Sequence, residues 1–190
     1  MSPSTKPRRE LSEWTPLPIT VVDYDPAWPV IFDRLRERIA TALGSLAVRI
    51  EHVGSTAVPG LAAKPIIDID TVIRALGDLP VAIESLEAIG YVHLPEIKGG
   101  PPGCEAFDRP PGDPVHHLFV CTQDADQLHK HIAFRDYMRT HPDARAEYVA
   151  LKRGLAARFS HDRLRYTESK TEFIERILLS AMSRGKPTAN

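Results

Sequence analysis

The sequence is poor in cysteine and nearly free of net charge, and both shortages exclude classes of protein. Only two cysteines occur in 190 residues, Cys104 and Cys121, far apart and without a CxxC spacing. They fit free thiols in a reducing compartment, although a disulfide stays open. The formal charge of −1, with no basic stripe, argues against a protein that binds DNA or RNA directly.

Long apolar segments are also missing. No stretch approaches the 18 apolar residues that a membrane-spanning helix needs. The first residues carry basic side chains with no apolar run behind them, so we do not expect a signal peptide. These absences favour a cytoplasmic protein with no membrane partner.

The hydrophobic content of 43% is enough for a real core. Residues 1–17 are polar and rich in proline, which predicts a flexible lead-in before a single domain over 18–185. Apolar periodicity predicts strands over 47–53, 66–73 and 115–120, sharing one mixed sheet. Helices are expected over 26–43, 79–89, 126–159 with a break near 141–142, and 167–182, and a short helical segment over 56–63. The fold class is therefore α+β, with α/β as the alternative.

Two aspartates stand out inside the otherwise apolar strand over 66–73. Asp68 and Asp70 are two positions apart, so their side chains share one face of the strand. Like charges at that separation repel unless a cation holds them, and neutralising one of them would then stabilise the free protein. Carboxylate oxygens suit Mg²⁺, which completes its shell with substrate phosphates. The pair is therefore predicted to be both the metal ligands and the catalytic carboxylates.

A glycine–serine pair precedes the aspartates at the end of the first strand. Gly54 lets the backbone approach a phosphate closely, and Ser55 offers a hydroxyl and an N–H at the start of the next turn. A solvent-exposed turn is the plain alternative for such a pair. Together with Asp68 and Asp70, the pair predicts a site for a nucleotide and its metal ion.

Basic side chains further along the chain are candidates for holding the phosphates. Tyr148 and Lys152, like Tyr166 and Lys170, are four residues apart, which places each pair on one helical face. They predict a cationic cleft lined by aromatic rings, or else a solvated helix face. Lys64, beside the strand of the aspartates, is predicted to reach a phosphate of the nucleotide, with a surface lysine as the alternative. Arg135, in an otherwise amphipathic helix, is also predicted to bind the nucleotide.

The histidines divide into one candidate ligand and several structural or surface residues. His116 and His117 are consecutive in a strand and point to opposite faces, so one of them faces the site. We assign that place, and a role as metal ligand, to His117. His52 is expected to be packed or to contact phosphate, and His129, His131, His141 and His161 are expected on the surface.

The motifs together resemble a known family. The Gly-Ser pair followed by Asp68-Ile69-Asp70 is similar to the signature of the nucleotidyltransferase superfamily, and the whole chain more closely resembles the GrpB family. The matching segments are 24–28, 50–65, 116–118, 133–137, 148–155 and 166–173. The resemblance implies a small mixed sheet flanked by helices, with a C-terminal helical part.

The resemblance also implies a function. It suggests an Mg²⁺-dependent nucleotidyltransferase that uses an NTP, expected to be ATP, and a small acceptor. Similar domains are fused to dephospho-CoA kinase, which implies a non-catalytic accessory or chaperone-like domain with a protein partner as the alternative. A nucleotide sensor that binds without turnover is the third interpretation.

One feature departs from the superfamily pattern. Such enzymes usually carry a third carboxylate on a neighbouring strand, here residues 115–120, which contain no acid. The family often has a histidine where this chain has Phe119. Glu105 and Asp108 could supply the missing acid if the segment that carries them folds inward. With two carboxylates, the pattern predicts one metal ion.

Overall fold

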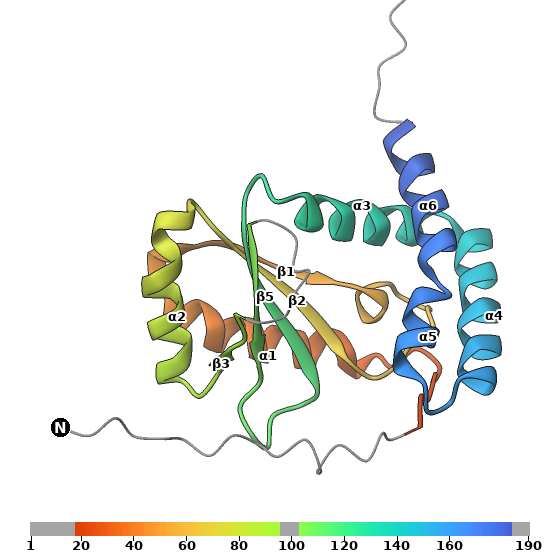
Figure 1. Ribbon diagram of the computed structural model, residues 1–190, viewed down its shortest axis with the longest axis horizontal. Coiled ribbons are helices and arrows are strands. Elements are labelled where there is room, and N and C mark those ends of the chain that lie inside the picture. The colour runs from red at the N-terminus through yellow and green to blue at the C-terminus, as the bar shows by residue number, and fades with distance from the viewer. Residues whose placement is uncertain (1–17, 96–102, 184–190) are drawn as a thin grey trace, which may run out of the picture.

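The sheet is mixed, as the strand pattern predicts. The computed structural model describes residues 18–95 and 103–183 (Figure 1). The five strands lie in the order β1-β2-β5-β4-β3, and only β2 and β5 run parallel. Their bounds are β1 Ala47–Val53, β2 Ile67–Ile73, β3 Val92–His93, β4 Cys104–Asp108 and β5 His116–Thr122. The predicted α+β class is confirmed.

Two helices cover one face of the sheet. Helix α1, Ala27–Leu43, and helix α2, Leu79–Ala88, pack against the isoleucines of β2. Leu35 and Ile39 of α1 are four residues apart, so they lie on one face of the helix. They are buried beside Ile67 and Ile69, which are two residues apart and so lie on one face of β2. Because this face of β2 is filled by isoleucines, Asp68 and Asp70 must face the other side.

The other face is covered from α3 onward. Helix α3 spans Asp126–Thr140 and α4 spans Pro142–Arg158, with Pro142 in the first turn where a missing N–H costs little. Helices α5, Arg163–Glu168, and α6, Thr171–Ser183, follow and complete a helical lobe beside the sheet (Figure 1). Phe134, Tyr148 and Phe173 join α3, α4 and α6 in a core of their own. This lobe is the predicted C-terminal helical part.

Two predicted helices differ from the structure. The segment over 56–63 is helical only in the single 3-10 turn Ser55–Ala57, after which the backbone becomes extended at Val58. The helix expected over 167–182 is divided between α5 and α6, with Ser169 and Lys170 in the break. Since Lys170 lies in that break, its side chain is directed by the junction of two helices and not by one continuous helix face.

The cysteines form a disulfide, contrary to the free thiols that the sequence favours. Cys104 and Cys121 are directly opposite each other on the antiparallel strands β4 and β5, with Cα atoms 4.1 Å apart. The strand register brings them together across 17 residues of chain, which cysteine spacing alone does not reveal. The bond is buried with Val72, Ala125 and Leu128, where the start of α3 packs on the sheet.

No helix in the described residues is both long and apolar enough to cross a membrane. The prediction of one domain over 18–185 stays a prediction.

Candidate functional site

The turn after β1 brings the backbone against the first aspartate. Gly54 has φ +69° and ψ −167°, a conformation that side chains disfavour. A Cβ atom on Gly54 would lie 2.1 Å from Oδ2 of Asp68, closer than any real contact. Glycine is therefore required twice over, by its dihedral angle and by the close carboxylate. Ser55 follows at the start of the 3-10 turn.

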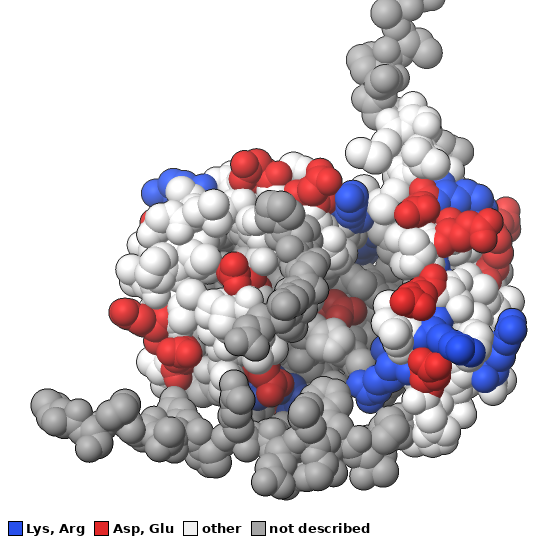
Figure 2. All heavy atoms as spheres, in the orientation of Figure 1, with Lys and Arg blue, Asp and Glu red and all other residues white. Residues whose placement is uncertain are grey.

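A cavity of about 460 Å³ opens in front of this turn, between the sheet and the helical lobe. Figure 2 shows the molecule hollowed between these two parts. Most of the predicted site residues line the cavity, namely Gly54, Ser55, Lys64, Asp68, His117, Lys152 and Lys170. Segments that are about 100 residues apart in the chain thus meet at one place.

Asp68 and His117 form one wall of the cavity. They are neighbours on the parallel strands β2 and β5, and Nδ1 of His117 lies 2.8 Å from Oδ1 of Asp68. The side chain of Asp68 is 31% exposed and that of His117 is 55% exposed, so both are open to a ligand. The structure thus places His117 at the predicted site.

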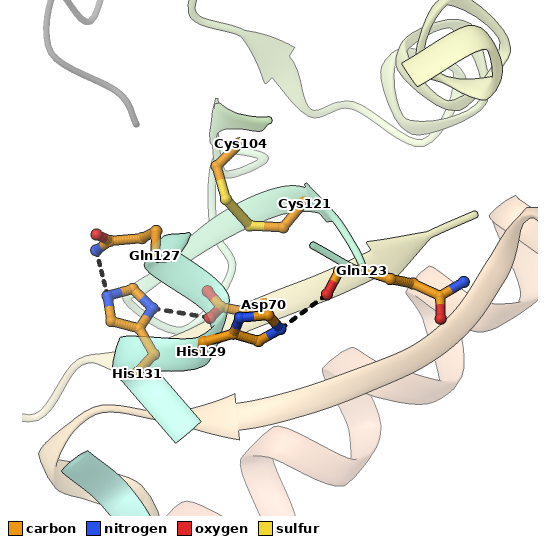
Figure 3. The surroundings of a disulfide bond; sticks show 7 residues. All are labelled: Asp70, Cys104, Cys121, Gln123, Gln127, His129 and His131. Carbon is orange, nitrogen blue, oxygen red and sulfur yellow. Dashed lines mark hydrogen bonds and ion pairs between the residues drawn. A yellow bond between two sulfur atoms is a disulfide. The ribbon is translucent and has the colours of Figure 1, made fainter. Parts of the chain in front are cut away.

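Asp70 does not line the cavity, because another side chain covers it. It is fully buried, and Nδ1 of His131 donates to its Oδ2 over 2.7 Å. The other ring nitrogen of His131 meets the amide of Gln127 (Figure 3). The expectation that His131 is a surface residue is therefore wrong. Burial opposes the charged form of His131, but the hydrogen bond and charge of Asp70, with the charge of Asp68, raise its pKa.

Strand β5, where the resemblance places a third acid, presents an aromatic ring beside Asp70. Phe119 is the residue of β5 that pairs with Asp70, and it lines the cavity. Neither alternative acid replaces it: Glu105 binds His93 over 2.9 Å, and Asp108 accepts from the backbone N–H of Arg109. Asp68 is therefore the carboxylate that the described residues present to the cavity.

Three lysines gather at the wall formed by the helical lobe. The Nζ of Lys152 lies 4.5 Å from the ring centre of Tyr148, while Lys170 and Lys64 lie 4.5 and 5.4 Å from that of Tyr166. In the described part of the chain, none of the three ammonium groups forms an ion pair with a carboxylate; the lysine ion pair found there joins Lys130 and Asp126. The cavity therefore holds three lysines without an ion-pair partner among the described residues, with the carboxylate of Asp68 on the same cavity.

These lysines hold their protons less tightly than usual. Burial, and then the charges of Lys170 and Lys64, lower the pKa of Lys152 to about 7. Burial and the charge of Lys64 lower the pKa of Lys170 to about 8, against the opposing effect of Asp68. Burial also lowers the pKa of Lys64. Each additional positive charge disfavours the next, so an anionic ligand would relieve a cost that the free protein carries.

Ser55 belongs to the same cluster. Nζ of Lys152 donates to Oγ of Ser55 over 3.2 Å and to the carbonyl oxygen of Ala62. Lys152 is only 3% exposed and Tyr148 only 4%, so this group of side chains is fixed by packing. Burial raises the pKa of Tyr148 above its ordinary value. A hydrogen bond with Ser55 acts on the same phenol in the opposite direction.

Arg135 is the predicted nucleotide ligand that the structure places elsewhere. Its guanidinium donates to Glu51 over 2.7 Å, to Asp136 over 2.8 Å and to the backbone oxygen of His52 over 3.1 Å. The side chain is 10% exposed and is not among the residues that line the cavity. Arg135 thus fixes α3 to β1, and its charge is already compensated.

Two further histidines are held by internal hydrogen bonds. Nε2 of His52 lies 3.0 Å from Oγ1 of Thr56, and its ring stacks on Phe32. Burial lowers the pKa of His52 to about 4, so the ring is neutral near pH 7. Nε2 of His116 lies 2.8 Å from the hydroxyl of Tyr91 on the opposite face from His117. The prediction that one of the two consecutive histidines is structural is thus confirmed.

The carboxylates fit a metal ion that also uses ligand oxygens. The described residues contain no group of three or more His, Cys, Asp or Glu side chains arranged for a metal. Oδ1 of Asp70, however, is buried and lacks any hydrogen-bond donor. The partly exposed Asp68 and this oxygen of the buried Asp70 are ligands of the type that a hard cation takes, with its remaining ligands from phosphate or water.

Comparison with known proteins agrees with this architecture. The family model described as GrpB protein matches residues 18–179. A UPF0157 protein of Halalkalibacterium halodurans is 36% identical over 86% of this chain and 82% of its own length. The UPF0157 protein YqkA of Bacillus subtilis is 32% identical over 90% of this chain, which spans only half the length of that relative. A dephospho-CoA kinase of Mycolicibacterium paratuberculosis is 34% identical over 76% of this chain and 41% of its own.

Solved structures show the same fold. The conserved protein GrpB from Enterococcus faecalis superposes with a TM-score of 0.78, at 31% identity, over 87% of this chain and 98% of that one. A MgGTP-bound structure of the Cid1 poly(U) polymerase superposes with a TM-score of 0.51, at 14% identity, over 72% of this chain and 45% of that one. At that identity the likeness concerns the fold alone, which is nucleotidyltransferase-like.

Proposed function

The chain belongs to the GrpB family, and from that premise we propose that its cavity binds a nucleoside triphosphate with Mg²⁺ and transfers the nucleotidyl group to a small acceptor. ATP is the first candidate. One observation carries the proposal: Lys64, Lys152 and Lys170 converge in a cavity where, among the described residues, none of them forms an ion pair with a carboxylate. Buried cations without partners are costly, so they are retained where a polyanion supplies the missing charge.

The residues at the other wall complete the binding of a triphosphate. The exposed backbone of Gly54 and the hydroxyl of Ser55 face the cavity beside the lysines. Glycine permits a close approach of phosphate oxygens, and the lysines neutralise the charge of the tail. Asp68 lies against Gly54 and lines the same cavity, so the metal and the phosphates would share one site.

Asp68, with the unpaired Oδ1 of Asp70 behind it, would hold the Mg²⁺. When bound, the ion supplies charge neutralisation at the phosphates and a fixed position for them. In the transfer, an acceptor oxygen forms a bond to the α-phosphorus, the bond from that phosphorus to the β-phosphate oxygen breaks, and pyrophosphate leaves. The acceptor proton passes to a base.

The dimensions of the site favour a small acceptor. A cavity of about 460 Å³ is within the ordinary range for a small-molecule site. The whole chain has a formal charge of −1, which does not favour a polynucleotide acceptor. The poly(U) polymerase shares the fold at low identity, and we do not carry its RNA substrate over to this chain.

A specific observation favours a second function, that of a non-catalytic accessory domain. This chain matches 41% of the length of the dephospho-CoA kinase from Mycolicibacterium paratuberculosis. A GrpB-like domain that assists a partner enzyme would keep the fold without the chemistry. The absence of an acid from β5 is compatible with that alternative.

A screen of the purified protein tests the proposal. Binding of each of the four NTPs is measured by calorimetry with and without Mg²⁺, and pyrophosphate release is measured across a panel of small alcohols and amines. Binding and release that both require Mg²⁺ would support the enzyme. Binding without release would indicate a nucleotide sensor. The absence of both binding and release would favour the accessory domain.

A further inference from the structure

Asp68, the carboxylate that the described residues present to the cavity, is assigned to the metal, so no second acid lines the cavity there to serve as the base of a direct transfer. Strand β5, where the resemblance to nucleotidyltransferases places a third acid, has Phe119 beside Asp70 and contains no acid. His131 already donates to Asp70, and His117 is already within hydrogen-bond distance of Asp68. A proton acceptor must therefore be sought among the other side chains that line the cavity.

Lys152 is the basic group that the structure couples to a hydroxyl. Its Nζ lies 3.2 Å from Oγ of Ser55, and it also donates to the carbonyl oxygen of Ala62. A neutral amine has two N–H groups and one lone pair. It can therefore keep its bond to Ala62 and accept the proton of Ser55 through the lone pair.

The surroundings favour the neutral amine. Lys152 is 97% buried, and its pKa is lowered to about 7 by burial and by the charges of Lys170 and Lys64. Near neutral pH a large fraction is therefore unprotonated without any change in the protein. A hydroxyl beside an amine of lowered pKa is the arrangement that activates serine nucleophiles in Ser–Lys enzymes.

The position of Ser55 is also that of a nucleophile. It follows Gly54, whose positive φ turns the chain sharply at the end of β1, and it lines the same cavity as Asp68. Lys152 is fixed against Tyr148, so the two partners stay aligned. We propose that Ser55 is a catalytic nucleophile with Lys152 as its base, so that the nucleotidyl group passes through a covalent intermediate on Ser55.

This inference rests on the proposed nucleotidyl transfer and divides it into two steps. In the first, Oγ of Ser55 bonds to the α-phosphorus, the bond to the β-phosphate oxygen breaks, pyrophosphate leaves and Lys152 takes the serine proton. In the second, the acceptor oxygen bonds to the same phosphorus, the bond to Oγ breaks and Lys152 returns the proton to Ser55. No oxidant or further reactant is needed, and the acceptor proton goes to solvent.

The test needs no knowledge of the acceptor. A covalent intermediate makes the first step reversible by itself, so the wild-type protein with Mg²⁺ and an NTP should exchange ³²P-labelled pyrophosphate into the NTP without any acceptor. Direct transfer cannot do this. Acid-quenched protein should in addition carry label from an α-³²P NTP, but not from a γ-³²P NTP, and mass spectrometry should locate it on Ser55.

Three variants sharpen the result. Ser55→Ala should lose the exchange completely while still binding the nucleotide. Lys152→Arg keeps the charge but cannot accept a proton, so exchange should fall roughly 10²- to 10⁴-fold with smaller effects on affinity. Ser85→Ala, an exposed serine of α2 whose hydroxyl bonds only to its own helix, is the matched control and should exchange as the wild type does.

The outcomes separate this inference from the proposed function. Acceptor-dependent pyrophosphate release with no exchange and no adduct would overturn the serine intermediate and leave the nucleotidyltransferase standing. Exchange that survives in Ser55→Ala would overturn it as well. Absence of both exchange and release with all four NTPs would overturn the two together. The adduct measurement uses only the wild type, so it holds even if a variant fails to fold.

Discussion

His131 of α3 donates through Nδ1 to Oδ2 of Asp70 over 2.7 Å, and Asp70 has no exposed surface at all. The second aspartate of the pair is therefore part of the contact between α3 and the sheet. Asp68, two residues earlier on the same face of β2, is the one that faces the cavity. The two carboxylates, equivalent in the sequence, consequently differ in what their removal should do.

Asp70→Asn should destabilise the free protein, by about 1–3 kcal/mol in the free energy of unfolding, because His131 loses its charged partner in a buried setting. The sequence alone predicts the opposite sign, from relief of repulsion between Asp68 and Asp70. Urea unfolding at pH 7 measures the difference. Asp126→Asn, which removes an exposed ion pair, should change stability by less than about 0.5 kcal/mol. Equal effects of the two variants would contradict the assignment.

Asp68→Asn should instead abolish Mg²⁺-dependent nucleotide binding with little effect on stability. The side chain is partly exposed and touches the ligand space, so the fold does not depend on its charge. Calorimetry with and without Mg²⁺ gives the affinity, and thermal unfolding gives the stability. Unchanged affinity with Mg²⁺ present would remove Asp68 from the site.

Gly54→Ala should cost more stability than Gly60→Ala. Both glycines have positive φ, +69° and +76°, so each substitution incurs a backbone penalty of roughly 1 kcal/mol or more. Only at Gly54 does the new Cβ also meet Asp68, whereas nothing lies within 4 Å at Gly60. Comparison of the two free energies of unfolding isolates the clash. Nucleotide binding should be lost only in Gly54→Ala, and its survival there would argue against a ligand at this turn.

Lys170→Met should stabilise the free protein and weaken nucleotide binding. The substitution removes a cation that repels Lys64 and Lys152 and has no acidic partner, while it keeps the length of the side chain. A gain of about 0.5–2 kcal/mol in the free energy of unfolding is typical when a substitution removes an unfavourable interaction from a functional site. Thermal unfolding and calorimetry are run on the same preparations, with Lys170→Arg as the variant that keeps the charge. A loss of stability in Lys170→Met would show that the ammonium group is structural.

The lysine cluster predicts a pH dependence of definite sign. The pKa values of Lys152 and Lys170 lie near 7 and 8 in the folded protein, below the ordinary value of 10.5, so above about pH 7 the unfolded chain binds more protons. The contribution of these groups to stability therefore increases as pH rises from about 7 towards 10. Urea unfolding across this range, in wild type and Lys170→Met, measures the contribution.

Ligand binding should show the reverse trend. Phosphate charges favour the protonated form of Lys170, whose pKa is lowered to about 8 in the free protein, so binding takes up protons and affinity falls as pH rises above about 8. Calorimetry in buffers of different ionisation enthalpy counts the protons. Proton release, or an affinity that rises with pH, would contradict an anionic ligand at these lysines.

The sequence by itself determined the features that depend on local geometry. Alternation in the strand over 66–73 places Asp68 and Asp70 on one face, because side chains of a strand repeat every two residues. The same rule separates His116 from His117, and four-residue spacing brings Lys152 over Tyr148. The position of Gly54 at the end of β1 likewise follows from the strand pattern and the need for a turn.

The tertiary structure decided which of these residues act together. Three contacts join segments that no periodicity relates. His131 covers Asp70, Arg135 binds Glu51, and Cys104 and Cys121 form a disulfide. The meeting of Ser55 with Lys152 depends in turn on how α4 packs against Val58 and Leu61 in the segment that follows β1. Contacts between residues far apart in the chain arise from the packing of whole elements, and local spacing carries information only over a few residues.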